Sequence, residues 1–481
     1  MRFYVVLRYI GVVMLFMALC MLISAGVSFA KGVDTAFYPL LLSSLLTALF
    51  GSFPMIFVAR QTQISIKEAY AIVVGSWLLA CVVSTFPYLI WGGEFNFVNA
   101  WFESVSGLTT TGASILTDIE ALPDGLLFWR MMSTWVGGIG VIMFSLLVLP
   151  SMGKSRLAIS NVEISPMAKE NYRYRTQIIV RIILVVYVGL TAITAILLNV
   201  AGMSLFDSVA HAMSSAATSG FSTKNTSIAY FDSALIESIL IFAMIGAGTH
   251  FGLIYATVTA KRINIFRSEV MRVYIIVMAV AAILIAINLV SAGVEGSILE
   301  SIRVSVFQVV SIYTTTGFAT TDTNLWPSFA VAILIFCSIV CACSGSTSGG
   351  IKTNRMIVAA KLFVNSMRQQ RHPNAILKVK IDGSILDQSV LHTVAVFIVI
   401  YLSIAFIGTL LCTLFGLDLT SAVTASIACI GNVGPGFGEV GSMNNYAALP
   451  VVVKYILSFL MLLGRLEIFG LFQLFMLSWW R

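Results

Sequence analysis

Long apolar segments separated by short polar ones run through the whole chain. Ten of them hold at least the roughly 20 apolar residues that a helix needs to cross a lipid bilayer. The pattern predicts about ten transmembrane helices, over residues 9–30, 36–59, 69–92, 125–150, 176–200, 234–260, 273–293, 328–365, 388–415 and 447–480. The longest polar connectors are 151–175, 261–272 and 366–387, so no long soluble domain interrupts the spans. The predicted fold class is all-α and integral to a membrane.

Composition supports this prediction. Residues of the set AVILMFWYC make up 59% of the 481 residues, charged residues only 10%, and the mean hydropathy is +0.97. Soluble domains carry roughly 25% charged residues, so a soluble enzyme, a nucleic-acid binder and a disordered scaffold are excluded. All seven cysteines lie in apolar runs, and we expect them to be membrane-core residues rather than disulfides or metal ligands.

The placement of Lys and Arg predicts the topology. If the N-terminus is cytoplasmic and the helices alternate, most basic residues fall in inner connectors, as the positive-inside rule requires. The outer side then keeps only Lys31, Arg130, Lys224, Arg303 and Lys454, and both termini are cytoplasmic. The first apolar run is longer than the roughly 7–15-residue core of a signal peptide, so we expect this span to be retained.

Four stretches of the chain resemble one another, at residues 100–114, 208–222, 304–319 and 422–437. Each begins with an amphipathic run of roughly 10–14 residues, which is too short to span a bilayer and suits a re-entrant helix. Each ends in a polar segment with one glycine at the matching place, namely Gly112, Gly220, Gly317 and Gly434. The residues before these glycines are Thr110-Thr111, Thr218-Ser219, Thr315-Thr316 and Asn432-Val433.

Every copy lies between two long apolar runs, and a second signature follows each glycine, at 137–140, 250–253, 349–352 and 464–467. Such periodicity indicates a repeat architecture. We predict a two-helix segment over 1–65 and four pore units over 66–153, 154–262, 263–366 and 367–481. The second and fourth units begin with a cytoplasmic linker.

A short helix that ends in a glycine-containing loop suits the binding of a dehydrated cation. Backbone carbonyls can replace the hydration shell of the ion without burying a fixed charge. Irregular backbone at membrane depth is tolerated only where protein buries it or it lines a wet cavity. A single Thr-Thr-Gly is usually an ordinary turn, but four copies in register favour four loops around one pore.

With these motifs, the chain resembles the Trk/Ktr/HKT superfamily of potassium transporters, and within it the Trk-type membrane subunits (TrkH/TrkG type). The most specific segments are 109–113, 345–352, 432–436 and 464–469. The resemblance covers essentially the whole chain. It implies four fused helix–re-entrant helix–helix units that build one channel-like pore for potassium uptake across the bacterial cytoplasmic membrane.

The resemblance also implies which residues bind potassium. The filter carbonyls would belong to Thr110, Thr111, Gly112, Thr218, Ser219, Gly220, Thr315, Thr316, Gly317, Asn432, Val433 and Gly434. Glycine in all four loops goes with potassium preference in the superfamily. The loops depart from the T-V-G-Y-G filter of tetrameric potassium channels, so selectivity is expected to be looser. Homodimers and a cytosolic nucleotide-binding regulatory subunit are expected partners; an organic cofactor is not.

Residues 344–350 are a run of seven Ser, Gly and Thr residues inside the eighth predicted span. Such a run should break the helix near mid-membrane, although a packing seam of small residues is an alternative. In the superfamily a gating loop occupies this place. The gating candidates are Gly345, Ser346, Thr347, Gly349, Gly350, Lys352 and Arg465.

Arg465 lies in the last predicted span, where a charge at the bilayer centre costs about 2.5–3.5 kcal/mol and should therefore face a cavity or a partner. Glu467 is a poor direct partner because it points to another side of the helix. The functional interpretation is an electrostatic barrier beside the ion path, and the alternative is an ion pair with another helix.

Two other functions are alternatives to a pore. A proton- or sodium-coupled symporter would use His250 or Glu467, although a packed neutral histidine is the more common case. A membrane-embedded enzyme would need a catalytic set inside the spans, and the sequence shows none.

Glu103 and Asp207, next to re-entrant helices, could concentrate cations at an outer mouth or be ordinary loop charges.

Overall fold

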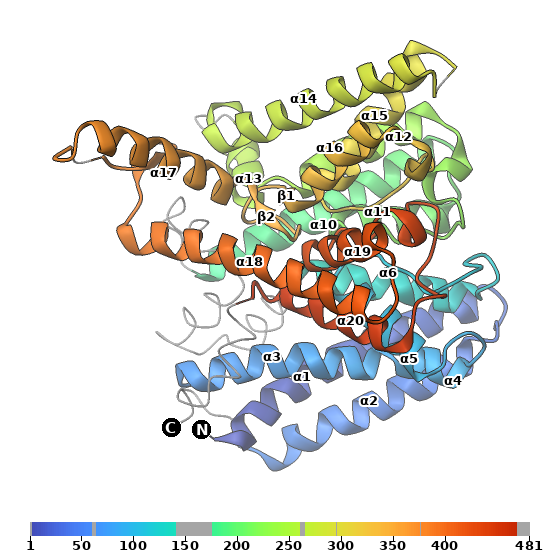
Figure 1. Cartoon of the computed structure of the whole chain (residues 1–481). Helices are drawn as coiled ribbons and strands as arrows, with labels where there is room; N and C mark the ends of the chain where they lie inside the picture. The colour runs from blue at the N-terminus through green and yellow to red at the C-terminus, as the bar shows by residue number, and fades with distance from the viewer. Residues whose placement is uncertain are drawn as a thin grey trace.

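The computed structural model describes residues 2–59, 64–140, 176–259, 265–294, 296–375 and 377–468. Most of these residues lie in helices, and the two sheets have only two short strands each. Most of the long helices share one general direction, as in a membrane-spanning bundle (Figure 1). The predicted all-α fold is therefore confirmed.

The first two helices, α1 (Phe3–Ala30) and α2 (Phe37–Phe57), form an antiparallel pair. A Cβ at Gly11 would lie 2.6 Å from the carbonyl oxygen of Gly51, and one at Gly51 would lie 2.8 Å from that of Gly11. The two glycines therefore allow the backbones to come closer than side chains would permit. Helix α1 also contacts α3 and α6, which ties this pair to the rest of the molecule.

The remaining elements are grouped by the ranges predicted for the four units, although α17 runs across the predicted boundary at 366/367. The first contains α3 (Ile66–Ser84), α4 (Phe86–Trp91), α5 (Phe97–Leu108) and α6 (Asp124–Ile139). The second contains α10 (Thr176–Val200), α11 (Leu205–Ala217), η1 (Ser227–Phe231), α12 (Ala234–Ala247) and α13 (Phe251–Thr259). The third contains η2 (Ile265–Arg267), α14 (Glu269–Ala292), α15 (Ile298–Tyr313), η3 (Thr323–Leu325), α16 (Ser328–Ile339), β1 (Val340–Cys341), β2 (Ile351–Lys352) and α17 (Thr353–Arg371). The fourth contains β3 (Lys380–Ile381), β4 (Ser384–Ile385), α18 (Gln388–Leu414), α19 (Leu419–Gly431), η4 (Gly438–Val440) and α20 (Val451–Arg465).

Six helical segments of the described chain are long and apolar enough to cross a membrane, and a bent pair makes a seventh. The six are Phe3–Ala30, Phe37–Phe57, Lys67–Trp91, Val180–Val200, Glu269–Ala292 and Gln388–Leu414. The end of the fourth predicted span (141–150) and the end of the tenth (469–480) lie outside the described residues. The count of ten spans stays a prediction.

Helices α6 and α20 end at Ile139 and Arg465, before the predicted ends of spans 125–150 and 447–480. Two other predicted spans are each divided into two helices. The segment 234–260 is bent by 101° between α12 and α13. The segment 328–365 divides into α16 and α17, with β1, a loop and β2 between them. The predicted break at residues 344–350 is thereby confirmed, because these small residues lie in that loop. Helix α17 also continues to Arg371, beyond the predicted end of the span.

The four re-entrant segments form short helices, α5, α11, α15 and α19. Each begins at a side-chain cap that accepts a hydrogen bond from a backbone N–H in the first turn, and the caps are Asn96, Ser204, Ser297 and Asp418. Caps of this kind satisfy donors that the helix itself leaves unpaired. Hydrogen bonds from Ser421 hold the pKa of Asp418 below its ordinary value, since they favour the ionised carboxylate.

Contacts between helices close the four units into a ring. The long helix that follows each loop contacts the re-entrant helix of the next unit, in the pairs α6–α11, α12–α15, α16–α19 and α20–α5. The last pair joins the fourth unit to the first. The four units therefore surround one centre, with α1 and α2 outside it (Figure 1).

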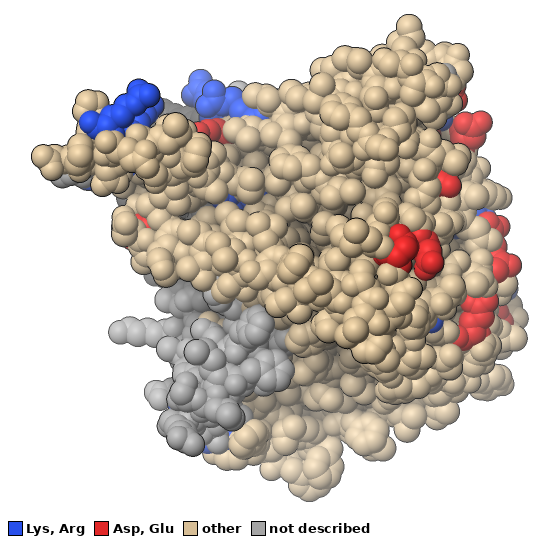
Figure 2. Space-filling model, viewed as in Figure 1, with Lys and Arg blue, Asp and Glu red and all other residues tan. Residues whose placement is uncertain are grey.

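Charged side chains separate along the bundle. On the visible face, Lys and Arg gather near α17 at one end, and most Asp and Glu lie at the other end (Figure 2). The basic end includes the exposed residues Arg368 and Arg371. This separation is the one that the positive-inside rule describes for a membrane protein.

Candidate functional site

A loop with the same backbone geometry follows each re-entrant helix. We name these segments loop 1 (109–116), loop 2 (218–223), loop 3 (314–320) and loop 4 (432–437). Two residues in each loop have positive φ: Thr110 and Gly112 (55° and 79°), Thr218 and Gly220 (55° and 78°), Thr315 and Gly317 (59° and 85°), and Asn432 and Gly434 (53° and 97°). The residue between each pair is not left-handed.

The left-handed threonines are unusual. Glycine adopts positive φ without cost, and asparagine does so fairly often, but a β-branched residue there is a genuine outlier. Such positions cost about 1–3 kcal/mol each and persist only where the surrounding structure imposes them. The sequence analysis located the four glycines, whose type suits positive φ, but missed the threonines, for which the recurrence of the motif is the available signal.

The four loops contact one another in a closed cycle. A Cβ built on Gly112 would collide with the carbonyl oxygen of Ser219. The corresponding collisions are Gly220 with Thr316, Gly317 with Val433, and Gly434 with Thr111. Each glycine thus lies against a carbonyl of the next loop, and loop 4 returns to loop 1. The predicted filter residues are therefore brought together around one axis.

The loop residues before the glycines are buried. Thr110, Thr111, Thr218, Ser219, Thr315, Thr316, Asn432 and Val433 are each at most 1% exposed. Hydrogen bonds hold several of these side chains: Asn432 Nδ2 donates to Thr111 Oγ1 and to the Met461 carbonyl, both at 3.0 Å. In loops 1 and 3 the hydroxyls of Thr109–Thr111 and Thr314–Thr316 lie 2.8 Å apart.

The loop between β1 and β2, residues 342–350, lies against the C-terminal ends of three re-entrant helices. Thr347 Oγ1 donates to the Ala216 carbonyl of α11 at 3.1 Å. The Gly349 N–H donates to Thr315 Oγ1 at 3.3 Å, and a Cβ on Gly349 would collide with the Gly431 carbonyl of α19. This intramembrane loop therefore sits directly beneath loops 2, 3 and 4.

Arg465 binds the intramembrane loop. Its Nη1 donates to the Thr347 carbonyl at 2.7 Å, and its Nη2 donates to the carbonyls of Gly137 and Gly138 at the end of α6. Its guanidinium also lies 5.9 Å from the ring centroid of Trp77. The small-residue loop and Arg465, which the sequence located separately, are thus in direct contact. The arginine connects α20 to this loop and to α6 of the first unit.

Comparison with known proteins decides the family. Residues 41–478 match the model of the TrkH family, described as cation transport protein. The chain belongs to the TrkH family of cation transport proteins. It is 32% identical to the Trk system potassium uptake protein TrkH of Salmonella typhimurium over 88% of both chains. It is 31% identical to TrkG of Escherichia coli over 87% of this chain and 86% of the relative.

A solved structure supports the same assignment. The crystal structure of the potassium transporter TrkH from Vibrio parahaemolyticus superposes with a TM-score of 0.88, at 28% identity, and the match covers 100% of both chains. The predicted resemblance to Trk-type membrane subunits is confirmed. The protein is a multi-pass membrane transport protein rather than an enzyme.

The gating candidates Gly345, Ser346, Gly349 and Gly350 belong to the intramembrane loop, and Lys352 lies next to it on β2. Lys352 Nζ is 3.1 Å from Glu467 Oε1, and Arg355 Nη2 is 2.7 Å from Glu467 Oε2. Glu467 therefore pairs with Arg355 of α17 and with its N-cap Lys352 rather than with Arg465. It lies beyond the end of α20, with a φ of 51°, so the turn after the helix and not a helical position directs it there. A Cβ on Gly345 would lie 2.6 Å from the His250 ring, in the break between α12 and α13.

The structure corrects the interpretation of one outer acid. Glu103 is fully buried and forms an ion pair with the equally buried Arg130, so it is not a charge at an outer mouth. Asp207 lies in the first turn of α11 and accepts from Thr223 Oγ1 at 2.6 Å. Within the described ranges, no group of three or more His, Cys, Asp or Glu could hold a metal ion.

Proposed function

We propose that this protein takes up potassium across the bacterial cytoplasmic membrane through a gated, potassium-selective pore. The closed cycle of loops 1–4 carries this proposal, because it brings four sets of backbone carbonyls to one axis. Carbonyl oxygens replace the hydration shell of a potassium ion without a fixed negative charge. The relatives are named potassium uptake proteins of the Trk system.

The ion-binding residues in this proposal are the residue with positive φ, its successor and the glycine of each loop. Successive residues that alternate between left-handed and other backbone conformations turn their carbonyls toward one side. The C-terminal ends of α5, α11, α15 and α19 lead into the loops, and their partial negative charge favours a cation. Potassium is the transported substrate, held by backbone oxygens rather than by acidic side chains.

The gate in this proposal is the intramembrane loop together with Arg465. The loop lies beneath three of the four loops, and Arg465 fastens it to the end of α6. Release of these contacts would open the path below the filter. A positive charge at this place also opposes cation passage, because little water is available to screen it.

The protein is proposed to act as a homodimer with a cytosolic nucleotide-binding regulatory subunit. The name of the relatives, a Trk system, implies more than one component. The basic end of the molecule near α17 would be the cytoplasmic face on which that subunit docks (Figure 2). Binding there could act on the gate through α17, which continues directly from β2 and the intramembrane loop.

Ion flux into proteoliposomes of the purified protein tests the proposal. Potassium, rubidium and sodium are compared, each with and without a pH gradient. Potassium and rubidium flux down their own gradients, with little sodium flux, is the expected result. Flux that requires the proton gradient would instead indicate a symporter. Glu467, a candidate for such coupling, already forms ion pairs with the side chains of Lys352 and Arg355. Equal flux of all three ions would refute selectivity.

A further inference from the structure

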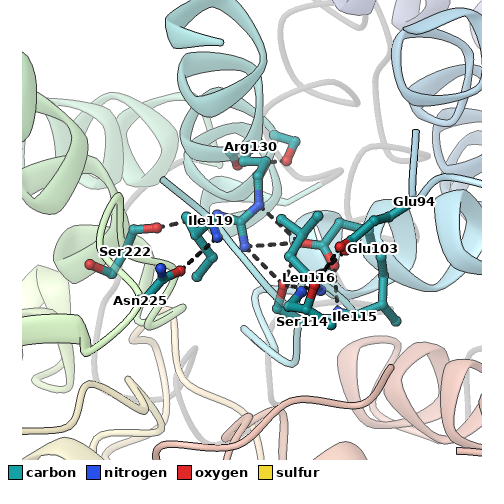
Figure 3. A network of polar contacts seen from close by, with 11 residues as sticks. Glu94, Glu103, Ser114, Ile115, Leu116, Ile119, Arg130, Ser222 and Asn225 are labelled. Carbon is teal, nitrogen blue, oxygen red and sulfur yellow. Dashed lines mark hydrogen bonds and ion pairs between the residues drawn. The ribbon is translucent and has the colours of Figure 1, made fainter. Parts of the chain in front are cut away.

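An ion pair without solvent contact lies behind loops 1 and 2. Both Glu103, on α5, and Arg130, on α6, are 0% exposed. The guanidinium Nε and Nη2 each lie 2.8 Å from Glu103 Oε1. Figure 3 shows Arg130 between Glu103 and Ser114 on one side and Ser222 on the other.

The pair contacts the segment of loop 1 that follows Gly112. Glu103 accepts from Ser114 Oγ at 3.0 Å and from the Ile115 N–H at 3.0 Å. Arg130 Nη2 donates to the same Ser114 hydroxyl at 3.2 Å. The segment of loop 1 directly after its glycine is therefore fixed by both members of the ion pair.

Arg130 also reaches loop 2. Its Nη1 donates to the Ser222 carbonyl at 3.2 Å, and its guanidinium stacks on Phe221, 4.1 Å from the ring centroid. Phe221 directly follows Gly220. Arg130 thus connects the segments that directly follow the glycines of two adjacent loops.

We propose that Glu103 and Arg130 are positioning residues that set the ion selectivity of the filter by fixing the distance between loops 1 and 2. This inference rests on the proposed potassium filter. Carbonyl rings discriminate between ions through the number and placement of their oxygens. The ion pair fixes the segments that follow the glycines of loops 1 and 2. It therefore acts on selectivity through the placement of the carbonyls in these two loops, although neither side chain touches the ion.

The four units differ at the position that Glu103 occupies in the first unit. The residue nine positions before the filter glycine is Glu103 in the first unit, and His211, Gln308 and Ala425 in the others. His211 contacts the equivalent serine, with Nε2 2.9 Å from Ser222 Oγ, and Ala425 cannot make a polar contact. The charged pair therefore distinguishes loop 1 and its contact with loop 2 from the rest of the ring.

A merely stabilising role would not call for this arrangement. A buried ion pair is rarely a net source of stability compared with apolar residues of similar volume, because both charges lose their hydration. Its geometry is nevertheless specific, since the carboxylate and the guanidinium impose fixed hydrogen-bond directions. The pair is suited to positioning a backbone.

Rubidium and sodium flux in proteoliposomes of the full chain tests the inference, with thermal stability measured in parallel. The variants are Glu103→Gln, Ser114→Ala and the double variant Glu103→Gln/Arg130→Gln. The double variant leaves no unpaired buried charge, so it should fold better than Glu103→Gln. We expect the rubidium-to-sodium flux ratio to fall about tenfold in both Glu103 variants, which corresponds to a change of about 1.4 kcal/mol in discrimination between the two ions. A smaller fall is expected in Ser114→Ala.

The ion pair between Arg303 and Glu237 provides a control, with Arg303 35% exposed. It joins α12 to α15 at 2.8 Å, and within the described part of the chain the ion pairs of Arg303 are with residues outside loops 1–4, so Glu237→Gln should lower stability and leave the flux ratio unchanged. If the double variant regains the stability of the parent and also its flux ratio, the pair only balances charge and the inference is overturned. An unchanged ratio in folded Ser114→Ala and Glu103→Gln also overturns it. If the unsubstituted protein shows no preference for rubidium over sodium, the proposed function itself is refuted, and this inference with it.

Discussion

The residue two positions before each filter glycine has the same left-handed backbone in all four loops, although three are threonines and one is Asn432. Only asparagine among these adopts that conformation readily. The threonines are held there by the helix end on one side and by the neighbouring loop on the other. Backbone strain at three of the four equivalent places indicates a site whose geometry is imposed by the whole ring.

Gly112→Ser is expected to lower the potassium-to-sodium flux ratio. Gly112 has a φ of 79°, and its Cβ would collide with the Ser219 carbonyl, so loop 1 or loop 2 must move. A change in discrimination of about 1.4 kcal/mol corresponds to a tenfold change in this ratio. Flux of each ion into proteoliposomes measures it.

Gly26→Ser is the control for this variant. A Cβ at Gly26 meets no atom within 4 Å, and this residue lies in α1, away from the loops. The control should keep the parent ratio. An unchanged ratio in a folded Gly112→Ser protein would contradict the assignment of loop 1 to the filter.

Arg465→Ala is expected to raise cation flux severalfold and to leave the ion preference intact. The substitution removes both a positive charge and the hydrogen bonds that join the intramembrane loop to α6. Rubidium uptake by proteoliposomes of equal protein content is the measurement. Arg368→Ala, at an exposed position near the end of α17, should keep the parent flux. No increase in the Arg465 variant would show that this arginine is structural.

At the scale of elements, the decisive features are two interruptions of predicted spans. The break between α12 and α13 and the loop between α16 and α17 meet: the Cys343 N–H donates to the Gly248 carbonyl at 3.0 Å, and the Phe251 N–H donates to the Gly345 carbonyl at 3.2 Å. Each interruption therefore satisfies backbone groups that the other leaves unpaired, which irregular structure inside a membrane requires.

Thr347→Val is expected to raise flux, although less than Arg465→Ala. Valine has a similar shape but cannot donate to the carbonyls of Ala216 and Ala247, so the loop is held less firmly. The comparison with Ser346→Ala is informative, because the Ser346 hydroxyl contacts only residues of the same loop, Cys343 and Ser348. If uptake measurements show equal effects for the two variants, the contact between Thr347 and α11 is not what holds the intramembrane loop in place.

At the scale of the whole molecule, closure of the ring depends on how successive units are oriented. The predicted arrangement, with two spans and a re-entrant segment in each unit, would give all four units the same orientation in the membrane. The contact between α20 and α5 then joins residues that are far apart in sequence. A pore formed in this way depends on all four units at once.

The orientation of the molecule can be measured by labelling single introduced cysteines in intact cells. All seven native cysteines are buried, which keeps the background low. Glu439→Cys, at an exposed position of the acidic end, should react with a membrane-impermeant maleimide, whereas Arg371→Cys at the basic end should not. The reverse pattern would place α17 outside and contradict the proposed topology. Permeabilised cells, in which both positions should react, provide the control.

The sequence by itself determined the class of the protein and located the residues of the candidate site. Apolar segments long enough for a bilayer, a low charge content and four copies of one motif are properties of the chain, and they located the four glycines and the small-residue loop. Helix caps such as Asn96 and Ser204 are local in the same sense, because their partners lie three residues away.

Tertiary structure alone decided which distant groups meet. Nothing near Arg465 in the chain indicates that it binds the Thr347 carbonyl, and nothing near Glu103 indicates that Arg130 removes it from the outer mouth. The bend after Ala247 and the left-handed threonines also depend on packing from other units. Local sequence sets hydropathy and capping, whereas buried charges and strained backbone find their partners only when the ring of four units is complete.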